Sequence, residues 1–168
     1  NEASFSKNLN YFINTFSDAN TPPIYTLHQS NGNQLKEILN NNKLSLKLAN
    51  YNTSKKEFFV LSTKNGDFNA WMIKPANFDA AKKYPVFMTQ YSGPGSQSVS
   101  NTWNSSNDYW YQHLAEKGYI IVCVDGRGTG FKGAVFKKVT YKELGKYEVE
   151  DKIESAKELV KRPYIDEN

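Results

Sequence analysis

The sequence predicts an α/β fold whose sheet becomes parallel in its later strands, preceded by a segment of short antiparallel strands. Two apolar runs, residues 85–91 and 119–124, lack the alternation of a half-exposed strand, which indicates strands covered on both faces. A helical pattern follows each run. Because strands and helices alternate, we expect parallel strands joined by right-handed crossovers.

The first 50 residues have a different character, with eleven asparagines and short alternating runs. They predict two or three antiparallel strands, with a hairpin turn at residues 30–33, Ser-Asn-Gly-Asn, because Asn and Gly tolerate positive φ. Residues 35–48 mix a helical turn with three consecutive asparagines, so an irregular segment is expected there. So few strands cannot bury both faces alone, and this segment should pack on another part of a larger β structure.

The pattern changes near residue 55, where the strands become more apolar. Residues 58–61 and 70–73 are expected to pair across a hairpin turn at residues 64–67, Lys-Asn-Gly-Asp. The first helix is predicted over residues 108–117, with its apolar side formed by Trp110, Leu114 and Tyr111 and its end at Gly118.

The last helix is predicted from a single apolar stripe, which should be its buried face. The stripe consists of Val149, Ile153, Ala156 and Val160. Ion pairs at i,i+4 spacing are expected between Glu148 and Lys152 and between Glu158 and Arg162.

The net charge of +4 and the pI near 9.0 raise the question of nucleic-acid binding. The basic residues are dispersed lysines, with Arg127 and Arg162 the only arginines, and this composition disfavours nucleic acid as a partner. His28 and His113 have no further ligand at metal-binding spacing, so no metal site is expected. The single Cys123 lies in an apolar run, and no apolar stretch is long enough to span a membrane.

Tyr91 is the candidate catalytic residue. It lies in residues 90–97, Gln-Tyr-Ser-Gly-Pro-Gly-Ser-Gln, directly after an apolar run. A tyrosine held where a strand meets a rigid loop can direct its phenol toward a developing negative charge, as in an oxyanion hole. The same residues are also typical of a tyrosine above a turn whose glycines and proline serve only the backbone.

A second glycine-rich segment, residues 128–133, matches the dinucleotide-binding pattern G-x-G-x-x-G. That fingerprint requires a helix directly after the glycines and an acidic residue about twenty positions on, at a strand end. Glu148 and Glu150 stand at that distance but at the start of a helix. A sharp turn at the edge of the sheet explains the glycines better than a cofactor does.

Three segments together resemble the dipeptidyl peptidase IV branch of the prolyl oligopeptidase family of serine peptidases. They are residues 83–97, the Asp-Gly-Arg-Gly loop within residues 124–130, and residues 147–151. The resemblance is specific over residues 55–168 and implies the N-terminal part of an α/β-hydrolase catalytic domain. Residues 1–54 resemble more loosely the last piece of that family's β-propeller.

The resemblance implies a serine exopeptidase that releases N-terminal dipeptides with proline or alanine in second position and uses no cofactor. Tyr91 then donates its hydroxyl to the tetrahedral oxyanion. Asp125 and Arg127 are expected to be a charged pair that fixes a turn. The partner is a peptide substrate; the resemblance allows a homodimer of the intact enzyme and implies the periplasm or cell envelope of a bacterium.

The chain departs from the family's pattern: no G-x-S-x-G motif occurs in it, and the acidic pair of the propeller that would bind a substrate's amino terminus is also missing. Ser92 and Ser96 have the wrong neighbours for a nucleophile elbow, and His113 falls in a predicted helix. The resemblance places the catalytic triad after Asn168, so we expect a fragment that is inactive alone. The alternatives are a non-catalytic binding module on an α/β fold and, more weakly, a dinucleotide-binding domain.

Overall fold

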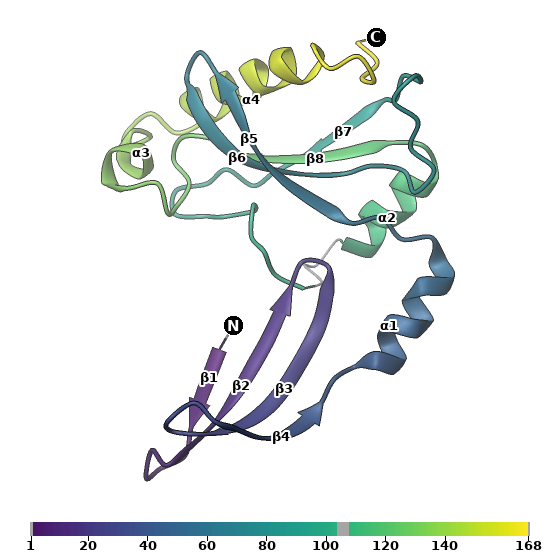
Figure 1. Cartoon of the computed structure of the whole chain (residues 1–168). Coiled ribbons are helices and arrows are strands. Elements are labelled where there is room, and N and C mark those ends of the chain that lie inside the picture. The colour runs from purple at the N-terminus through teal and green to yellow at the C-terminus, as the bar shows by residue number, and fades with distance from the viewer. Residues whose placement is uncertain (1, 104–107, 168) are drawn as a thin grey trace. The chain divides into compact units, whose positions relative to one another are not determined.

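A computed structural model describes residues 2–103 and 108–167, and residues 1, 104–107 and 168 lie outside the described part. The chain divides into two compact units, which Figure 1 shows with their helices and strands. The first unit comprises residues 1–53 and 101–108, and the second comprises residues 54–100 and 109–168.

The first unit contains a four-stranded antiparallel sheet whose strands follow chain order. Its strands are β1 (Glu2–Phe5), β2 (Tyr11–Asp18), β3 (Thr21–Gln29) and β4 (Gln34–Leu39). The hairpin turn between β3 and β4 is confirmed. The sheet has one strand more than the upper count predicted from the sequence.

The prediction of an irregular segment at residues 35–48 is wrong. This stretch contains β4 and then α1 (Asn42–Leu48), followed by the short 3₁₀ helix η1 (Ala49–Tyr51). Every residue of β4 is exposed, so backbone pairing with β3 defines the strand and no apolar alternation marks it. Asn41 takes a left-handed conformation with φ of 54° and forms the junction between strand and helix.

The second unit contains a mixed four-stranded sheet in the order β5-β6-β8-β7. Its elements are β5 (Lys56–Thr63), β6 (Gly66–Ile73), β7 (Val86–Thr89), α2 (Asp108–Glu116), β8 (Ile120–Asp125), α3 (Ala134–Lys138) and α4 (Lys146–Leu159). β5 and β6 form the predicted hairpin, β6 runs antiparallel to β8, and β7 runs parallel to β8. The prediction of a sheet that becomes parallel in its later strands is therefore confirmed.

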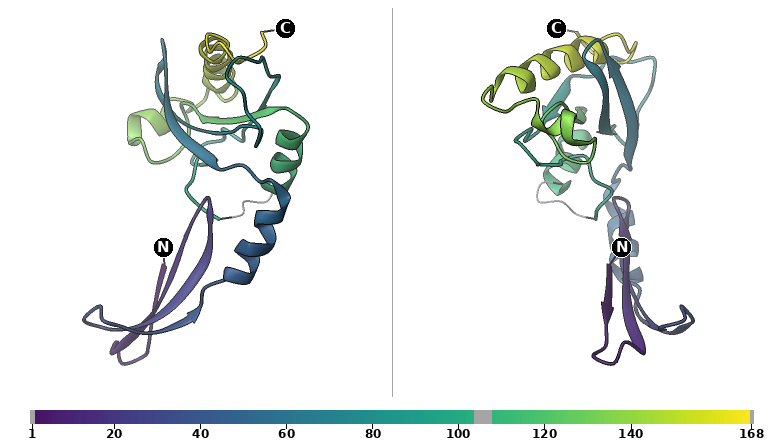
Figure 2. Two further views of the ribbon diagram at one scale, coloured as in Figure 1. Left: turned by 45° about the vertical axis from the view of Figure 1, so that its right-hand side comes forward. Right: turned by 90° about the vertical axis from the view of Figure 1, so that its left-hand side faces the viewer.

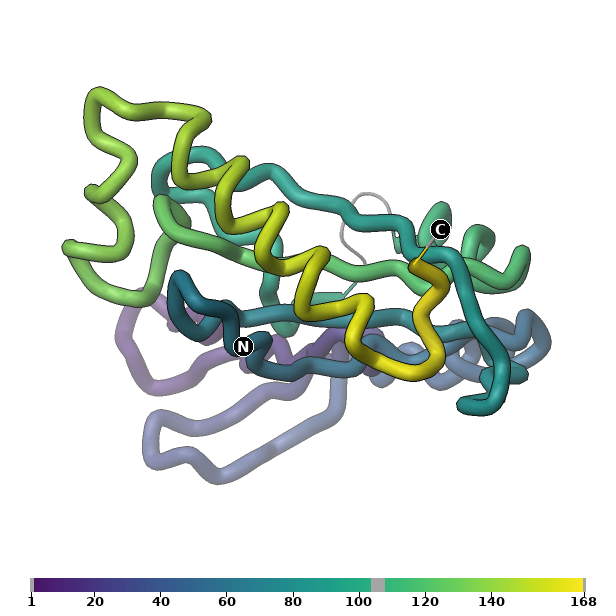
Figure 3. Tube along the Cα trace, turned by 90° about the horizontal axis from the view of Figure 1, so that it is seen from above, coloured from purple at the N-terminus to yellow at the C-terminus, as the bar shows by residue number. Residues whose placement is uncertain are grey.

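Strand β8 is buried at all six positions, as its continuous apolar sequence predicts. Its alternate residues enter two different cores: Ile120, Val122 and Val124 pack with Leu159 of α4 in one, and Ile121 and Cys123 pack in the other, with α2. Figures 1 and 2 show α4 and α2 on opposite faces of this sheet, and Figure 3 shows α4 crossing its strands. The carboxyl ends of β7 and β8 are thereby held in a three-layer unit.

The strand predicted over residues 85–91 is shorter and less covered than expected. β7 comprises four residues, and the Phe87 side chain is 41% exposed. β7 is at the edge of the described sheet and pairs only with β8 among the strands there, so part of its surface remains open.

The predicted apolar face of α2 is confirmed in part: Tyr111 is buried and Leu114 packs against the same core, whereas Trp110 is exposed. The predicted face of α4 is wrong. The apolar stripe of α4 does not enter the core: Val149, Ile153 and Val160 are exposed. The buried face of α4 instead carries Asp151, Glu154, Ser155 and Leu159.

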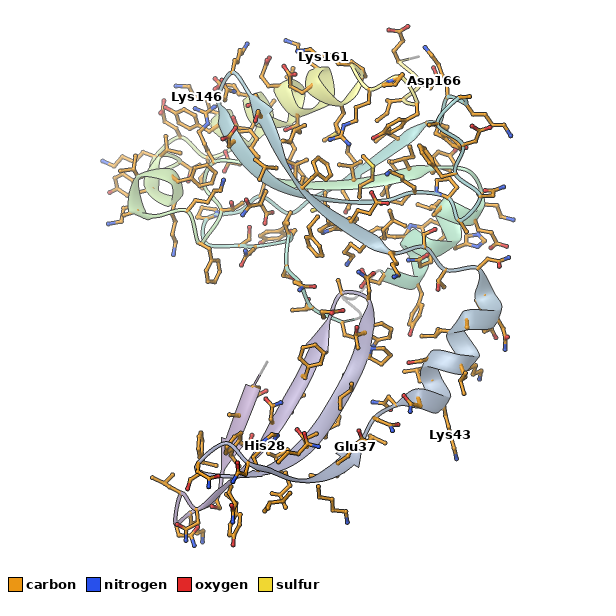
Figure 4. All side chains as sticks on the ribbon, viewed as in Figure 1. His28, Glu37, Lys43, Lys146, Lys161 and Asp166 are labelled. Atoms are coloured by element: carbon orange, nitrogen blue, oxygen red, sulfur yellow. The ribbon has the colours of Figure 1, made fainter. Side chains whose placement is uncertain are left out.

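The two predicted i,i+4 ion pairs of α4 are absent from the ion pairs of the described residues, because other partners take these side chains. The Glu148 carboxylate accepts the backbone N–H of Gly145 at 2.9 Å and caps the helix. The Lys152 ammonium donates to the carbonyl of Val124 in the core, and Glu158 pairs with Lys161 at 2.6 Å. Figure 4 labels Lys146 and Lys161, which lie near the two ends of α4.

Burial makes the Cys123 thiol unreactive. The side chain is 1% exposed, and desolvation, with a smaller contribution from the charge of Asp125, raises the pKa of Cys123 to about 12. Below that pH the thiol stays protonated, and the thiolate is the nucleophile. Iodoacetamide at pH 8 should therefore leave the folded chain unmodified and alkylate it fully in urea, as measured by intact mass. Equal labelling rates in both conditions would contradict the buried position.

Among residues 2–103 and 108–167, no helix is both long enough and apolar enough to cross a membrane.

Candidate active site

Tyr91 lies in the loop that follows β7 and is 77% exposed. The next residue, Ser92, is buried and takes a left-handed conformation with φ of 57°, which is uncommon for a residue with a side chain. The Ser92 hydroxyl donates to Oε1 of Gln90 at 2.8 Å. The side chains on both sides of Tyr91 are thus joined to each other, while the Tyr91 side chain remains accessible.

The aromatic ring of Tyr91 lies over the backbone of Gly93. A Cβ atom at position 93 would stand 2.6 Å from Cε1 of Tyr91, closer than real Cβ contacts allow. Glycine is required here so that the ring can keep this position. The chain then turns, because the Gly93 carbonyl accepts both the backbone N–H of Ser96 at 3.0 Å and its hydroxyl at 2.7 Å.

The Tyr91 loop and the glycine-rich loop after β8 are hydrogen-bonded to each other. Gly95 N–H donates to the Gly128 carbonyl at 3.2 Å, and Gly130 N–H donates to the Ser96 carbonyl at 2.9 Å. The structure thus brings together two motifs that lie about 30 residues apart in the sequence. Both loops leave the carboxyl ends of β7 and β8, which are parallel.

The glycines of the second loop serve this packing and not an open phosphate cradle. A Cβ atom at position 128 would stand 2.7 Å from Cγ2 of Thr140, so the protein itself fills the space at this glycine. The helix after Gly133 is α3, which has only five residues. The dinucleotide alternative gains no support from this geometry, because its pyrophosphate needs close backbone access at the start of a helix.

We expect Gly128→Ala to destabilise the chain more than Gly118→Ala. Both glycines have similar φ angles, +99° and +92°, but only position 128 meets a neighbour, since nothing lies within 4 Å of a Cβ at position 118. The left-handed strain costs about 1–2 kcal/mol in either variant, and the clash with Thr140 adds roughly 1–3 kcal/mol. Urea unfolding of the two variants measures the difference, and equal losses would show that Thr140 moves away freely.

Asp125 and Arg127 do not pair with each other, contrary to the sequence prediction. The Asp125 carboxylate accepts the backbone N–H groups of Ser98 at 3.0 Å and Val99 at 2.8 Å. Arg127 instead binds Asp151 of α4, with 2.6 Å between its terminal nitrogen and Oδ1. Asp125 therefore holds the segment at residues 98–99, whereas Arg127 joins the loop after β8 to α4.

The Arg127–Asp151 pair is buried on the aspartate side, where Asp151 is 1% exposed. Oδ2 of Asp151 also accepts the backbone N–H of Arg127 at 2.7 Å, and Oδ1 accepts from Asn65 in the β5–β6 turn at 3.0 Å. Hydrogen bonding to Asp151 raises the pKa of Arg127 above its ordinary value. Sequence reasoning missed Asp151 and Asn65 as the partners that anchor this loop.

The two histidines contact residues that lie close to them in the sequence. His28 is on β3 (Figure 4), and its ring nitrogens contact the Thr26 hydroxyl at 2.8 Å and the Gly32 carbonyl at 3.0 Å. His113 stacks on Trp110 of the same helix at 5.7 Å between ring centroids. Within the described ranges, no three His, Cys, Asp or Glu side chains gather as a metal site would require.

Chemically, the site offers an exposed phenol on a fixed backbone at the carboxyl ends of two parallel strands. In open α/β sheets ligands bind outside these strand ends. A phenol hydroxyl held there can donate a hydrogen bond to an anionic oxygen.

Comparison with known proteins identifies relatives for almost the whole chain. The sequence model of the prolyl oligopeptidase family matches residues 103–168. Dipeptidyl peptidase 4 of Trichophyton equinum is 38% identical over 170 residues, which cover 99% of this chain and 22% of that protein. Prolyl endopeptidase FAP of Mus musculus is 40% identical over 149 residues, which cover 86% of this chain and 19% of that protein.

Comparison with solved structures gives relatives of the same kind. The crystal structure of Porphyromonas gingivalis dipeptidyl peptidase 4 matches with a TM-score of 0.90 and 41% identity, over 98% of this chain and 23% of that one. A putative dipeptidyl aminopeptidase IV from Bacteroides ovatus matches with a TM-score of 0.84 and 29% identity, over the same shares. The chain thus spans less than a quarter of the length of these relatives. It belongs to the prolyl oligopeptidase family, in which its relatives include dipeptidyl peptidase 4 proteins.

Proposed function

We propose that this chain is part of a serine-type dipeptidyl peptidase that releases N-terminal dipeptides with proline or alanine in second position. The observation that carries the proposal is the exposed Tyr91 on a hydrogen-bonded loop at the carboxyl end of β7. The names of the relatives give the reaction class. In the complete protein, the Tyr91 hydroxyl donates a hydrogen bond to the oxyanion that forms when the scissile carbonyl is attacked.

The proposal divides the chain as the sequence does, with residues 1–54 as the end of a β-propeller and residues 55–168 as the beginning of an α/β-hydrolase domain. A parallel bridge between Tyr84 and Ile165 supports the second assignment. Tyr84 N–H donates to the Tyr164 carbonyl, and Asp166 N–H donates to the Tyr84 carbonyl, each at 2.9 Å. The chain after α4 therefore begins to run beside β7 as a further parallel strand would.

The nucleophile is not supplied by this chain in the proposal, because the sequence contains no G-x-S-x-G motif. The serine, aspartate and histidine come from other parts of the complete protein. The 168-residue chain alone should therefore not hydrolyse a Gly-Pro anilide. Turnover that persists through repurification and disappears in a Tyr91→Phe variant would overturn this assignment.

The test uses the protein encoded by the complete reading frame. It should hydrolyse Gly-Pro-p-nitroanilide, fail to hydrolyse the same substrate with a blocked amino group, and lose activity to a fluorophosphonate. Cleavage of the blocked substrate at an equal rate would replace the exopeptidase with an endopeptidase. No hydrolysis of either, together with no G-W-S-x-G-G motif in the complete sequence, would favour the non-catalytic binding module.

A further inference from the structure

Asp125 is a buried carboxylate at the end of β8, 4% exposed. Its two oxygens accept the backbone N–H of Ser98, at 3.1 Å and 3.0 Å, and its Oδ2 accepts the N–H of Val99 at 2.8 Å. A buried carboxylate is tolerated when such donors surround it. Its hydrogen bonds therefore bind the segment that continues from the Tyr91 loop to the end of a core strand.

A part-buried ammonium group lies near the end of β8 that carries Asp125. Lys152 of α4 donates to the carbonyl of Val124, the residue before Asp125. Burial lowers the pKa of Lys152, and the nearby Cys123, Asp125 and Asp151 act in the opposite direction. Asp125 thus has a cation near its backbone, and its carboxylate accepts backbone amides of the segment after the Tyr91 loop.

Further contacts hold the same segment from other directions. The indole N–H of Trp71, on β6, donates to the Ser98 carbonyl at 3.1 Å, so residue 98 is fixed through both its N–H and its carbonyl. The Ser96 carbonyl accepts from Gly130, and the Gly93 carbonyl accepts from Ser96. The chain of contacts leads from Asp125 through the turn at Gly93 to the ring of Tyr91.

We propose that Asp125 is a positioning residue, which sets the location of the Tyr91 hydroxyl by holding the segment that follows the Tyr91 loop. The inference rests on the proposed function for its catalytic consequence. Tyr91 itself is exposed and its ring contacts the backbone at Gly93, so the position of the hydroxyl depends on the loop beneath it. A displacement of about 1 Å at such a group can cost up to roughly 100-fold in rate.

Asp151 offers a matched control, because it is a second buried aspartate beside the same turn. It binds Arg127 and Asn65 and accepts no hydrogen bond from residues 90–99 in the described contacts. Both Asp→Asn substitutions replace one carboxylate oxygen by an amide donor, which faces an existing N–H donor and weakens the local hydrogen bonds. A purely structural role would make the two variants behave alike.

The experiment uses the complete protein with Asp125→Asn or Asp151→Asn, each with and without Tyr91→Phe. We expect Asp125→Asn to lower kcat by about 10-fold when Tyr91 is present and by less than about 2-fold with Tyr91→Phe, because the lost rate acts through the hydroxyl. Asp151→Asn should change kcat by the same factor in both backgrounds. Equal losses from Asp125→Asn in both backgrounds would overturn the proposal.

Hydrogen exchange tests the same inference and needs no activity assay. In Asp125→Asn, amides of residues 90–99 should exchange faster while those of residues 120–124 keep their protection, and unchanged exchange at residues 90–99 would refute the inference. Hydrogen exchange can be measured even if the complete protein proves not to be a peptidase. The positioning role of Asp125 and the peptidase function can therefore be refuted independently of each other. If Asp125→Asn does not fold, Trp71→Phe, which removes the donor to the Ser98 carbonyl and keeps an aromatic ring in the core, takes its place in both measurements.

Discussion

Replacement of Tyr91 by phenylalanine in the complete protein is expected to lower kcat on a Gly-Pro anilide by about 10²–10³, with a much smaller change in KM. The substitution keeps the ring that lies over Gly93 and removes only the hydroxyl. An oxyanion donor interacts more strongly with the transition state than with the ground state, so its loss appears in kcat. Steady-state kinetics at saturating and limiting substrate separate the two parameters.

Tyr141→Phe is the matched control, because Tyr141 is 76% exposed in the same unit and Tyr91 is 77% exposed. It should leave kcat within about 2-fold of the unmodified protein, as expected for a surface substitution away from the reaction. A full-rate Tyr91→Phe enzyme would remove Tyr91 from the mechanism. Equal losses in both variants would point to a general effect of removing surface hydroxyl groups.

Patterns that are local in sequence correctly predicted β8 and the β5–β6 hairpin of the second unit. The run at residues 119–124 has no polar position, and β8 is buried on both faces as that implies. The Lys-Asn-Gly-Asp turn sets the register of β5 and β6, with Thr63 opposite Gly66. Each feature depends on neighbours within a few residues, which a sequence displays directly.

Features that depend on distant partners were not predictable in the same way. Periodicity assigned the apolar stripe of α4 to the core, but the buried face carries Asp151, whose charge is balanced by Arg127 some 24 residues earlier. The match to the family's Asp-Gly-Arg-Gly loop suggested that Asp125 and Arg127 pair, yet Asp125 binds the backbone of residues 98–99 and Arg127 binds α4. A pattern of residue types does not reveal which charges meet across a fold.

The candidate site contains both kinds of feature, those that depend on sequence neighbours and those that depend on distant partners. Tyr91 and its loop were identified from adjacent residues, Gly93 and Ser92 among them. The hydrogen bonds from Gly95 and Gly130 to the opposite loop, and the role of Asp125 at Ser98, arise only when β7 and β8 align in parallel. The resemblance supplied the order of the motifs, and the structure supplies their contacts.

Asp151→Ala is expected to destabilise the chain by about 3–5 kcal/mol, the usual cost of removing one partner from a buried ion pair. Asp151 is 1% exposed and binds both the guanidinium and the backbone N–H of Arg127. Its loss leaves that N–H and the Asn65 amide, whose hydrogen bonds are part-buried, without their acceptor. Urea unfolding followed by tryptophan fluorescence measures the change.

Glu150→Ala provides the comparison, because Glu150 also contacts Arg127, at 3.2 Å, but is 49% exposed. An exposed ion pair contributes at most about 1 kcal/mol, since water screens both charges and competes for them. The two neighbouring acidic residues share Arg127 and differ in burial and in their further hydrogen bonds, so a much larger loss is expected from Asp151→Ala. A loss from Asp151→Ala as small as that from Glu150→Ala would mean that water replaces the carboxylate and that the turn at Arg127 holds without α4.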